Sequence, residues 1–248
     1  DSDGSEKLEH GIFLNTDVTN AVIAGNIING VNNGDGIYVN GGTKVVIGSN
    51  TITVDTASEG IVIAGTTNFN IHNNDISGVT NGLDINCTAT IEGVVSGNIL
   101  GFDTSGIDIN LVSGSKCSVF GNTLTGDVAT DGIRAVAGAT GFLNISKNTS
   151  TGATNGVIIT DCGDVVVKGN NISGAITVTD SSAQNAVING NNCGQITAGG
   201  SSTSVYTISG NTQTGLGAVR LIDVDRAKTV VMSGNTAINT LSLGYRLD

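Results

Sequence analysis

Apolar and polar residues alternate in short runs along this chain, and one such run recurs at a nearly constant interval. Each run contains an Asn that we use as an anchor, and successive anchors are 20 to 26 residues apart. The anchors are Asn26, Asn50, Asn74, Asn98, Asn122, Asn148, Asn170, Asn191, Asn211 and Asn235. Ten units at so regular an interval indicate a repeat architecture in which each unit stacks on the next.

The apolar positions keep a fixed distance from each anchor. Ile, Val or Met stands three residues before it, and a second, mostly apolar residue stands five before it. A second pattern, Gly-Ile-x-Ile or a close variant, opens the earlier units, for example at residues 36–39, 60–63, 82–85 and 106–109. Apolar residues two positions apart predict β-strands with one face turned inward. A single strand cannot bury that face, but stacked units build a continuous core.

Composition narrows the class of protein further. The 248 residues include 37 Gly, no Pro and only 3% aromatic residues, and Gly does not recur at every third position, which excludes collagen. The mean hydropathy of +0.17 and the 12% of charged residues argue against disorder. No apolar run approaches the roughly 20 residues of a membrane span. A β-rich, turn-rich protein is the class that remains.

Short strands, Gly/Asn turns and a period near 24 predict a parallel β-helix, in which like residues lie above like about 4.8 Å apart. From residue 11 to about 243 the repeat resembles the parallel β-helix repeat of pectate lyases, polygalacturonases and phage tailspikes. The resemblance implies an all-β, single-stranded right-handed parallel β-helix (a solenoid) of about ten coils. Residues 1–10 are then an N-terminal extension and residues 244–248 a C-terminal tail.

The anchor Asn and the Cys residues have structural interpretations. Asn tolerates the left-handed backbone of a tight corner, and stacked Asn amides can hydrogen-bond along the rod as a ladder. Cys117 and Cys193 fall on inward positions and are expected to be buried thiols, whereas Cys87 and Cys162 fall in predicted turns. Their spacing matches neither a disulfide framework nor a metal site.

Chemistry is expected on the outward positions, of which the x of Gly-Ile-x-Ile is one. Asp84 and Asp108 occupy this position on neighbouring coils, and Arg134 follows one coil later. Repulsion between two close carboxylates raises one pKa, which leaves a proton donor beside a base, as glycoside hydrolysis requires. Clustered Asp residues on an outer face are also what the resemblance to polygalacturonases implies. In that case Arg134 would bind a uronate. The alternative is an ordinary charged surface row that Arg134 and solvent neutralise.

A second candidate site stands just before the Gly-Ile strands. Asp35 and Glu59 form another carboxylate pair there, and Tyr38 is close in sequence. This group could bind a sugar, or Ca²⁺, which prefers oxygen ligands, and no other cofactor is expected. The alternative is that these are polar corner residues without a ligand. His10 and His72 are far apart in coil order, so no histidine-based site is predicted.

Charge and surface pattern bear on the partners. The formal net charge of −11 and the lack of a basic stripe disfavour nucleic acid and anionic membranes, and no membrane insertion is expected. A row of Val four residues before the anchors is a candidate contact surface with another chain, or simply a sign of β propensity. The likeness to tailspikes implies self-association as a trimer. Uncapped ends would favour further domains, another partner or a filament.

Two functions follow as hypotheses. The first is an extracellular, cell-surface or virion rod, namely the structural or receptor-binding shaft of a tailspike-like or surface-fibre protein that binds a polysaccharide or a cell-surface glycan. Regular coils without long insertions favour it. The second is a polysaccharide hydrolase or lyase that uses Asp84 and Asp108, which the stacked carboxylates favour.

Overall fold

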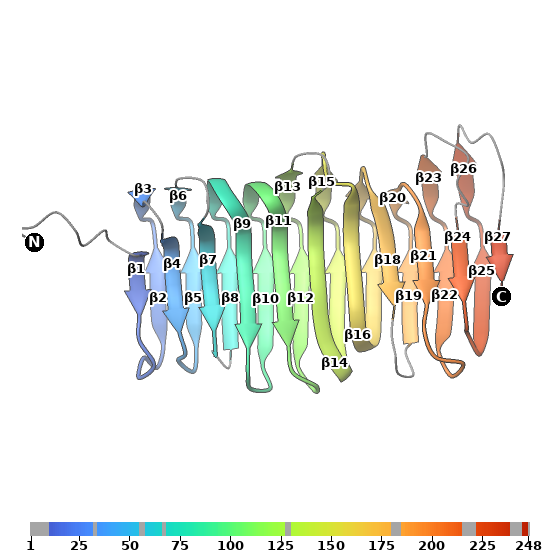
Figure 1. Cartoon of the computed structure of the whole chain (residues 1–248), viewed down its shortest axis with the longest axis horizontal. Helices are drawn as coiled ribbons and strands as arrows, with labels where there is room; N and C mark the ends of the chain where they lie inside the picture. The colour runs from blue at the N-terminus through green and yellow to red at the C-terminus, as the bar shows by residue number, and fades with distance from the viewer. Residues whose placement is uncertain are drawn as a thin grey trace, which may run out of the picture.

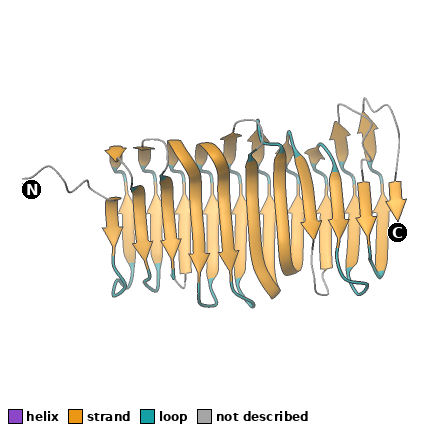
Figure 2. Cartoon of the chain, in the orientation of Figure 1, coloured by secondary structure: helices purple, strands orange, loops and turns teal. Residues whose placement is uncertain are grey.

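The structure is a computed structural model that describes residues 10–31, 34–54, 58–65, 68–126, 130–179, 185–214 and 222–238, together with the backbone of residues 245–247. These residues form 27 β-strands joined by turns, and no helix occurs among them (Figure 2). A helix able to cross a membrane is accordingly not found in the described part of the chain.

The strands line up along a rod as three faces (Figure 1). The Gly-Ile face contains β1 (His10–Leu14), β4 (Asp35–Asn40), β7 (Glu59–Ala64), β18 (Ala175–Thr179), β21 (Ile196–Gly199), β24 (Ile222–Asp225) and β27 (Tyr245–Leu247). The valine face contains β2 (Ala21–Ala24), β5 (Val45–Gly48), β8 (Asn68–His72), β10 (Glu92–Ser96), β12 (Lys116–Phe120), β19 (Asn185–Asn189), β22 (Val205–Ser209) and β25 (Thr229–Ser233).

The threonine face is made of shorter strands. It contains β3 (Ile27–Val31), β6 (Thr51–Val54), β13 (Thr123–Gly126), β15 (Thr149–Thr151), β17 (Asn171–Ile172), β20 (Asn192–Cys193), β23 (Thr212–Thr214) and β26 (Thr236–Ile238). Four long strands turn a corner and belong to two faces. β9 (Asp75–Cys87) and β11 (Ile99–Leu111) run from the threonine face to the Gly-Ile face. β14 (Asp131–Ser146) and β16 (Asn155–Lys168) run from the Gly-Ile face to the valine face.

Neighbouring strands pair in parallel, one coil apart, and the register places one residue per coil in each column. Tyr38 of β4 pairs with Val62 of β7, and Val62 pairs with Asp84 of β9. Sequence order is therefore also order along the rod, as the colour gradient shows (Figure 1). The prediction of an all-β parallel β-solenoid with coils of about 24 residues is confirmed.

The core consists of inward columns of aliphatic side chains. In one column of the Gly-Ile face every residue from Ile37 to Ile222 is at most 1% exposed: Ile37, Ile61, Leu83, Ile107, Ile133, Val157, Ile176, Ile196 and Ile222. Where a large ring enters the core, the next coil makes room for it. The ring of Phe69 fills the space beside Gly93, one coil later. A Cβ at position 93 would overlap that ring, so a residue without a side chain stands there. Packing between coils thus explains both the repeat and its exceptions.

The anchor Asn residues form the predicted ladder at the corner between the valine and threonine faces. Each side-chain Nδ2 donates to the Oδ1 of the anchor one coil later at 2.9–3.1 Å. Each backbone N–H donates to the same oxygen. From Asn50 to Asn211 the anchors are at most 2% exposed, so these bonds lie inside the rod.

The expectation that the anchor itself adopts the left-handed backbone was wrong. The residue before each anchor does so, usually Gly, with φ between 54° and 70° at this position along the rod. No anchor has a positive φ. A Gly such as Gly97 relieves the steric cost of the corner, and the Asn that follows it is left free to turn its amide inward.

All four Cys residues are buried, and none of them forms a disulfide. This confirms the inward placement of Cys117 and Cys193. It corrects the expectation for Cys87 and Cys162, which lie buried within β9 and β16 rather than in turns. Burial, with a smaller contribution from Cys87, raises the pKa of the Cys117 thiol to about 12.

The ends of the repeat differ slightly from the expected boundaries. Strand β1 begins at His10, within the predicted N-terminal extension. Strand β27 pairs with β24 in the segment predicted to be a C-terminal tail. Parallel pairing therefore extends further along the chain than the apolar pattern indicates.

Candidate functional site

Two columns of side chains on the Gly-Ile face contain all of the predicted site residues. The outer column consists of Phe13, Tyr38, Val62, Asp84, Asp108, Arg134, Ile158, Thr177, Thr197 and Asp223. The corner column, at the start of each strand, consists of His10, Asp35, Glu59, Asn81, Ser105, Asp131 and Asn155. Counting along the repeat predicts that Arg220 follows Thr197 in the outer column. In the structure Asp223 occupies that position, and Arg220 lies outside the described residues.

Asp84, Asp108 and Arg134 lie on three successive coils, as predicted. Arg134 binds the Asp108 carboxylate through two donors: its Nε donates to Oδ1 at 3.1 Å, and its Nη2 donates to Oδ2. The Arg134 side chain is 51% exposed and that of Asp108 is 19% exposed. A pair this open to water contributes little to stability, but its two-point geometry holds both side chains in place.

The two carboxyl groups have different surroundings. Burial raises the pKa of Asp84 above its ordinary value of 3.8, and the negative charges of Asp108 and Glu59 raise it further, while Arg134 lowers it. Asp108, in contrast, faces a cation directly. Asp84 therefore keeps its proton to a higher pH than an ordinary Asp, beside a carboxylate that is held by an Arg.

Arg134 is poorly placed to bind a uronate. Its hydrogen bond with Asp108 is the largest effect and raises its pKa. Burial lowers the pKa, and the charges of Asp108, Asp131 and Asp84 raise it further. An acidic sugar that approached Arg134 would also meet the negative charges of these three carboxylates. The expectation of uronate binding at this residue is therefore not favoured by its surroundings.

The second predicted group, Asp35, Glu59 and Tyr38, is also brought together. The Asp35 residue is only 8% exposed. Its Oδ1 accepts a hydrogen bond from the backbone N–H of Glu59 at 3.2 Å, and Asn81 Nδ2 donates to Glu59 Oε1 at 3.3 Å. Burial, followed by the hydrogen bond to Asp35 and the charge of Asp35, raises the pKa of Glu59 above 4.5.

Histidine is the feature that the sequence-based prediction missed. His10 Nδ1 lies 3.1 Å from Asp35 Oδ2, and the imidazole stacks on the ring of Tyr38 with centroids 4.7 Å apart. Phe13 completes the stack, 5.6 Å from His10 and 5.7 Å from Tyr38. The position of His10 in the corner column, one coil before Asp35, was the sequence signal for this contact.

Metal binding finds no support in the side chains that the structure places. Within the described ranges, no group of three or more His, Cys, Asp or Glu side chains is arranged to hold a metal ion. Asp35 and Glu59 are occupied with His10, Asn81 and each other. Calcium at this position therefore remains a prediction.

The valine face offers a groove and an interrupted apolar row. The groove, of about 590 Å³, is shallow and is lined by residues that include Lys44, Glu92, Lys116 and Phe142, none of them a predicted site residue. In the row, Val and polar residues alternate irregularly in register: Val22, Val46, Asn70, Val94, Ser118, Asn144, Val166, Val187, Thr207 and Val231. The predicted apolar stripe is therefore not continuous.

The coils and their register define the class of protein as a parallel β-solenoid. Comparison of the chain with family models, with curated proteins and with solved structures finds no match. The side chains on the Gly-Ile face are therefore the basis for any functional conclusion.

Proposed function

We propose that the chain is the rod-shaped shaft of an extracellular, cell-surface or virion protein of the tailspike or surface-fibre type, and that its Gly-Ile face binds a polysaccharide or cell-surface glycan. The observation that carries the proposal is the group of stacked rings, His10, Phe13 and Tyr38, next to the carboxylates of Asp35 and Glu59. Rings offer apolar surface to the C–H faces of a sugar, and carboxylates accept hydrogen bonds from its hydroxyls.

The regularity of the rod supports a shaft. Parallel pairing joins successive coils on all three faces, and the Asn ladder runs through the described length. Strands inside the rod pair with the strand one coil before and the strand one coil after, so the rod is built from contacts between neighbouring coils. Its surface is then free to vary from coil to coil, as the outer column does.

Charge selects among glycans. The net charge is −11, and the ring stack is followed along the face by Glu59, Asp84 and Asp108. Like charges across an interface oppose binding, so a neutral or amino sugar polymer fits this face better than a polyuronate. The rings and the carboxylates together point to hexose hydroxyls as the groups recognised.

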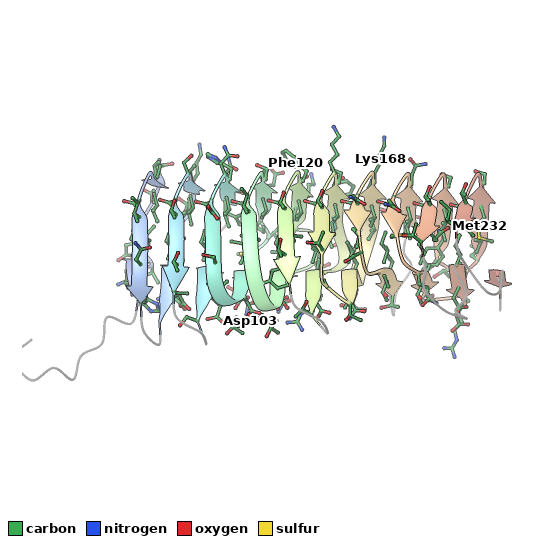
Figure 3. All side chains as sticks on the ribbon, turned by 90° about the horizontal axis from the view of Figure 1, so that it is seen from above. Asp103, Phe120, Lys168 and Met232 are labelled. Atoms are coloured by element: carbon green, nitrogen blue, oxygen red, sulfur yellow. The ribbon has the colours of Figure 1, made fainter. Side chains whose placement is uncertain are left out.

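A binding experiment with matched aromatic variants tests the proposal. A panel of neutral, amino and acidic glycans is titrated into the chain by calorimetry, and the best ligand is repeated with Phe13→Ala and Tyr38→Ala. Phe13 is 51% exposed, whereas Phe120, 41% exposed on another edge of the rod, provides the control (Figure 3). We expect about a tenfold loss of affinity, or about 1.4 kcal/mol, in the first two variants and none in Phe120→Ala. Equal affinities of Phe13→Ala and Phe120→Ala would refute binding at the stack.

A second candidate function, polysaccharide hydrolysis or elimination, is favoured by the different surroundings of Asp84 and Asp108. A carboxyl that keeps its proton to a higher pH than usual, beside a second carboxyl that is paired with a cation, is an arrangement suited to an acid and a base. The strands that carry Asp84 and Asp108 are hydrogen-bonded neighbours, with backbones about 4.8 Å apart. Retaining glycosidases hold their two carboxyl groups about 5–5.5 Å apart. In this scheme Asp84 protonates the leaving oxygen and Asp108, oriented by Arg134, attacks the sugar or takes a proton.

Release of reducing or unsaturated ends from the same glycan panel tests the second candidate. Asp84→Asn and Asp108→Asn should each abolish turnover without loss of binding. Asp75→Asn, an exposed Asp on the threonine face, is the control. Two results would count against an enzyme. One is turnover that persists in Asp84→Asn, and the other is that the unmodified chain turns over none of the glycans.

Self-association, as a trimer or a filament, remains part of the proposal for a shaft. Val22 and Val231 are 72% and 51% exposed, and the valine row offers several further apolar contacts. Light scattering gives the mass in solution. A mass of about three chains supports a trimer, and a single chain of 24.8 kDa argues against the valine row as an interface.

A further inference from the structure

Two outward columns of side chains on the threonine face belong to neither candidate site. The strands of this face follow one another along one side of the rod (Figure 1). The first column consists of Ile27, Thr51, Asp75, Ile99, Thr123, Thr149, Asn171, Asn192, Thr212 and Thr236. The second column, two residues further along the chain in each coil, consists of Asn29, Thr53, Ser77, Gly101, Thr125, Thr151, Ser173, Gly194, Thr214 and Ile238. Nine of these twenty residues are Thr, and five more are Ser or Asn.

The hydroxyl groups of these columns face solvent. The residue between the two columns points into the core, as Leu124 does at 0% exposure, while Thr123 and Thr125 on either side of it are exposed. Among the described side chains of the two columns, one pair of hydroxyls is hydrogen-bonded, that of Thr53 with Ser77 at 3.4 Å. The other hydroxyls therefore make their hydrogen bonds with water.

Charge is nearly excluded from this face. The chain has 21 acidic and 10 basic residues, yet Asp75 is the one charged residue among the twenty of the two columns. The outer and corner columns of the Gly-Ile face, in contrast, hold several carboxylates, among them Glu59, Asp84 and Asp108. A surface that only has to stay in solution normally carries charges of both signs. The threonine face therefore suits a partner that is itself uncharged.

The parallel register arranges the hydroxyls as a grid. Paired residues such as Thr123 and Thr149 lie on hydrogen-bonded neighbouring strands, whose backbones are about 4.8 Å apart. Within one strand, Thr123 and Thr125 are separated by two residues, which is about 6.6 Å. The side chain of Thr is branched at Cβ and has few rotamers, so the grid is held in place. The face thus presents hydroxyls and methyl groups at two fixed intervals that are perpendicular to each other.

We propose that the threonine face binds the surface of ice. Oxygen atoms on a prism face of hexagonal ice form a rectangular grid, and its two intervals are similar to those of the hydroxyl columns. Each Thr hydroxyl donates and accepts hydrogen bonds, and water beside a Thr methyl group keeps its hydrogen bonds to other water. Water held between the columns therefore takes positions that a crystal can continue. A charged row could not do this, because an ion orients the surrounding water toward itself.

The best-formed part of the grid lies in the middle of the rod. The two outward Thr of β13, Thr123 and Thr125, pair with the two outward Thr of β15, so that four hydroxyls occupy adjacent grid points. One coil earlier, Ile99 takes the place of Thr123 and is 55% exposed. Ile99 therefore interrupts the first column beside its most regular part.

The freezing behaviour of a solution of the whole chain tests the proposal. A protein that adsorbs to ice lowers the freezing temperature below the melting temperature, since ice must then grow as curved fronts between the bound molecules. This gap is measured by nanolitre osmometry, and the fraction of the chain that enters slowly grown ice is measured in parallel. We expect a gap that widens with protein concentration, and enrichment of the chain in the ice fraction.

Matched variants locate the binding on the threonine face. Thr125→Lys and Thr151→Lys each place a long charged side chain at an exposed point in the middle of the grid, and each should lose most of the gap. Thr229→Lys places the same side chain on the valine face, where Thr229 is also exposed, and should keep the gap. Ile99→Thr fills the interruption and should widen the gap. Circular dichroism checks that each variant retains its β structure.

Three results would overturn ice binding. One is an unmodified chain that shows no gap and is excluded from the ice. Another is an equal loss in Thr151→Lys and Thr229→Lys, and the third is a gap in Ile99→Thr that is no wider than before. If Thr151→Lys does not fold, the comparison of Thr125→Lys with Thr229→Lys decides. No glycan is present and the Gly-Ile face is unchanged in every variant, so failure here is distinct from failure of the proposed glycan binding.

Discussion

Replacement of Asn98 by Ala tests whether the buried Asn ladder holds the coils together. Asn98 is fully buried, and its side chain takes part in four hydrogen bonds. Its Oδ1 accepts the Nδ2 of Asn74 at 2.9 Å and the backbone N–H of Asn74 at 3.0 Å. Its Nδ2 donates to Asn122 Oδ1 at 2.9 Å and to the Ile71 carbonyl at 3.1 Å.

The magnitude follows from the groups that Asn98→Ala leaves without a partner. The backbone N–H of Asn74, one N–H of its side chain and the Ile71 carbonyl each lose a bond inside the rod. A buried polar group left unsatisfied costs about 1–3 kcal/mol, so three such groups should lower the unfolding free energy by roughly 3 kcal/mol or more. A loss of this size is a large fraction of the unfolding free energy of a typical domain, which is roughly 5–15 kcal/mol.

The assay is denaturant unfolding followed by circular dichroism, with Asn110→Ala as the control. Asn110 is exposed at the end of β11 on the Gly-Ile face, and its loss should change the unfolding free energy by less than about 0.5 kcal/mol. The slope with denaturant should stay the same in both variants if the folded rod is retained. Equal midpoints for Asn98→Ala and Asn110→Ala would refute the view that the ladder stabilises the rod.

Three further predictions concern the core and the outer column. Gly93→Ala should destabilise the rod by about 1–3 kcal/mol, because the new Cβ overlaps the Phe69 ring, and adding Phe69→Leu should restore the denaturation midpoint. Cys117, with a pKa of about 12, should resist a thiol reagent at about pH 8 until the chain is unfolded; rapid labelling of the folded chain contradicts this. Asp84 binds its proton more tightly when folded, so thermal stability should fall as the pH rises above 3.8. In Asp84→Asn the thermal stability should depend less on pH. An unchanged dependence would contradict the raised pKa of Asp84.

Much of the candidate site could be predicted because a solenoid turns sequence interval into spatial neighbourhood. Subtracting one period from Asp108 gives Asp84, and the structure pairs these residues. The same arithmetic placed Asp35 before Glu59. It failed at Arg220, because the coil that follows Thr197 is longer and brings Asp223 to that position instead. Irregular coil lengths are where counting along the chain loses the register.

Contacts within the site needed three-dimensional structure. The corner column indicated that His10 precedes Asp35, but not that its ring turns onto Tyr38 while its Nδ1 meets the carboxylate. The pairing of Arg134 with Asp108 was left open as one of two interpretations. Side-chain direction at a corner depends on the backbone bend and on the residues one coil away, and neither is contained in a local pattern.

The sequence by itself determined the repeat, the parallel β-solenoid, the inward columns and the Asn ladder, because each of these depends on residue type at a constant interval. Only the tertiary structure decided how deeply each polar group is buried and which groups meet. Asp35 and Asp108 are both carboxylates of the same face, yet one is enclosed beside His10 and the other is paired with Arg134 near the surface. That difference arises from the coils packed before and after each residue, because they decide which partner each carboxylate meets.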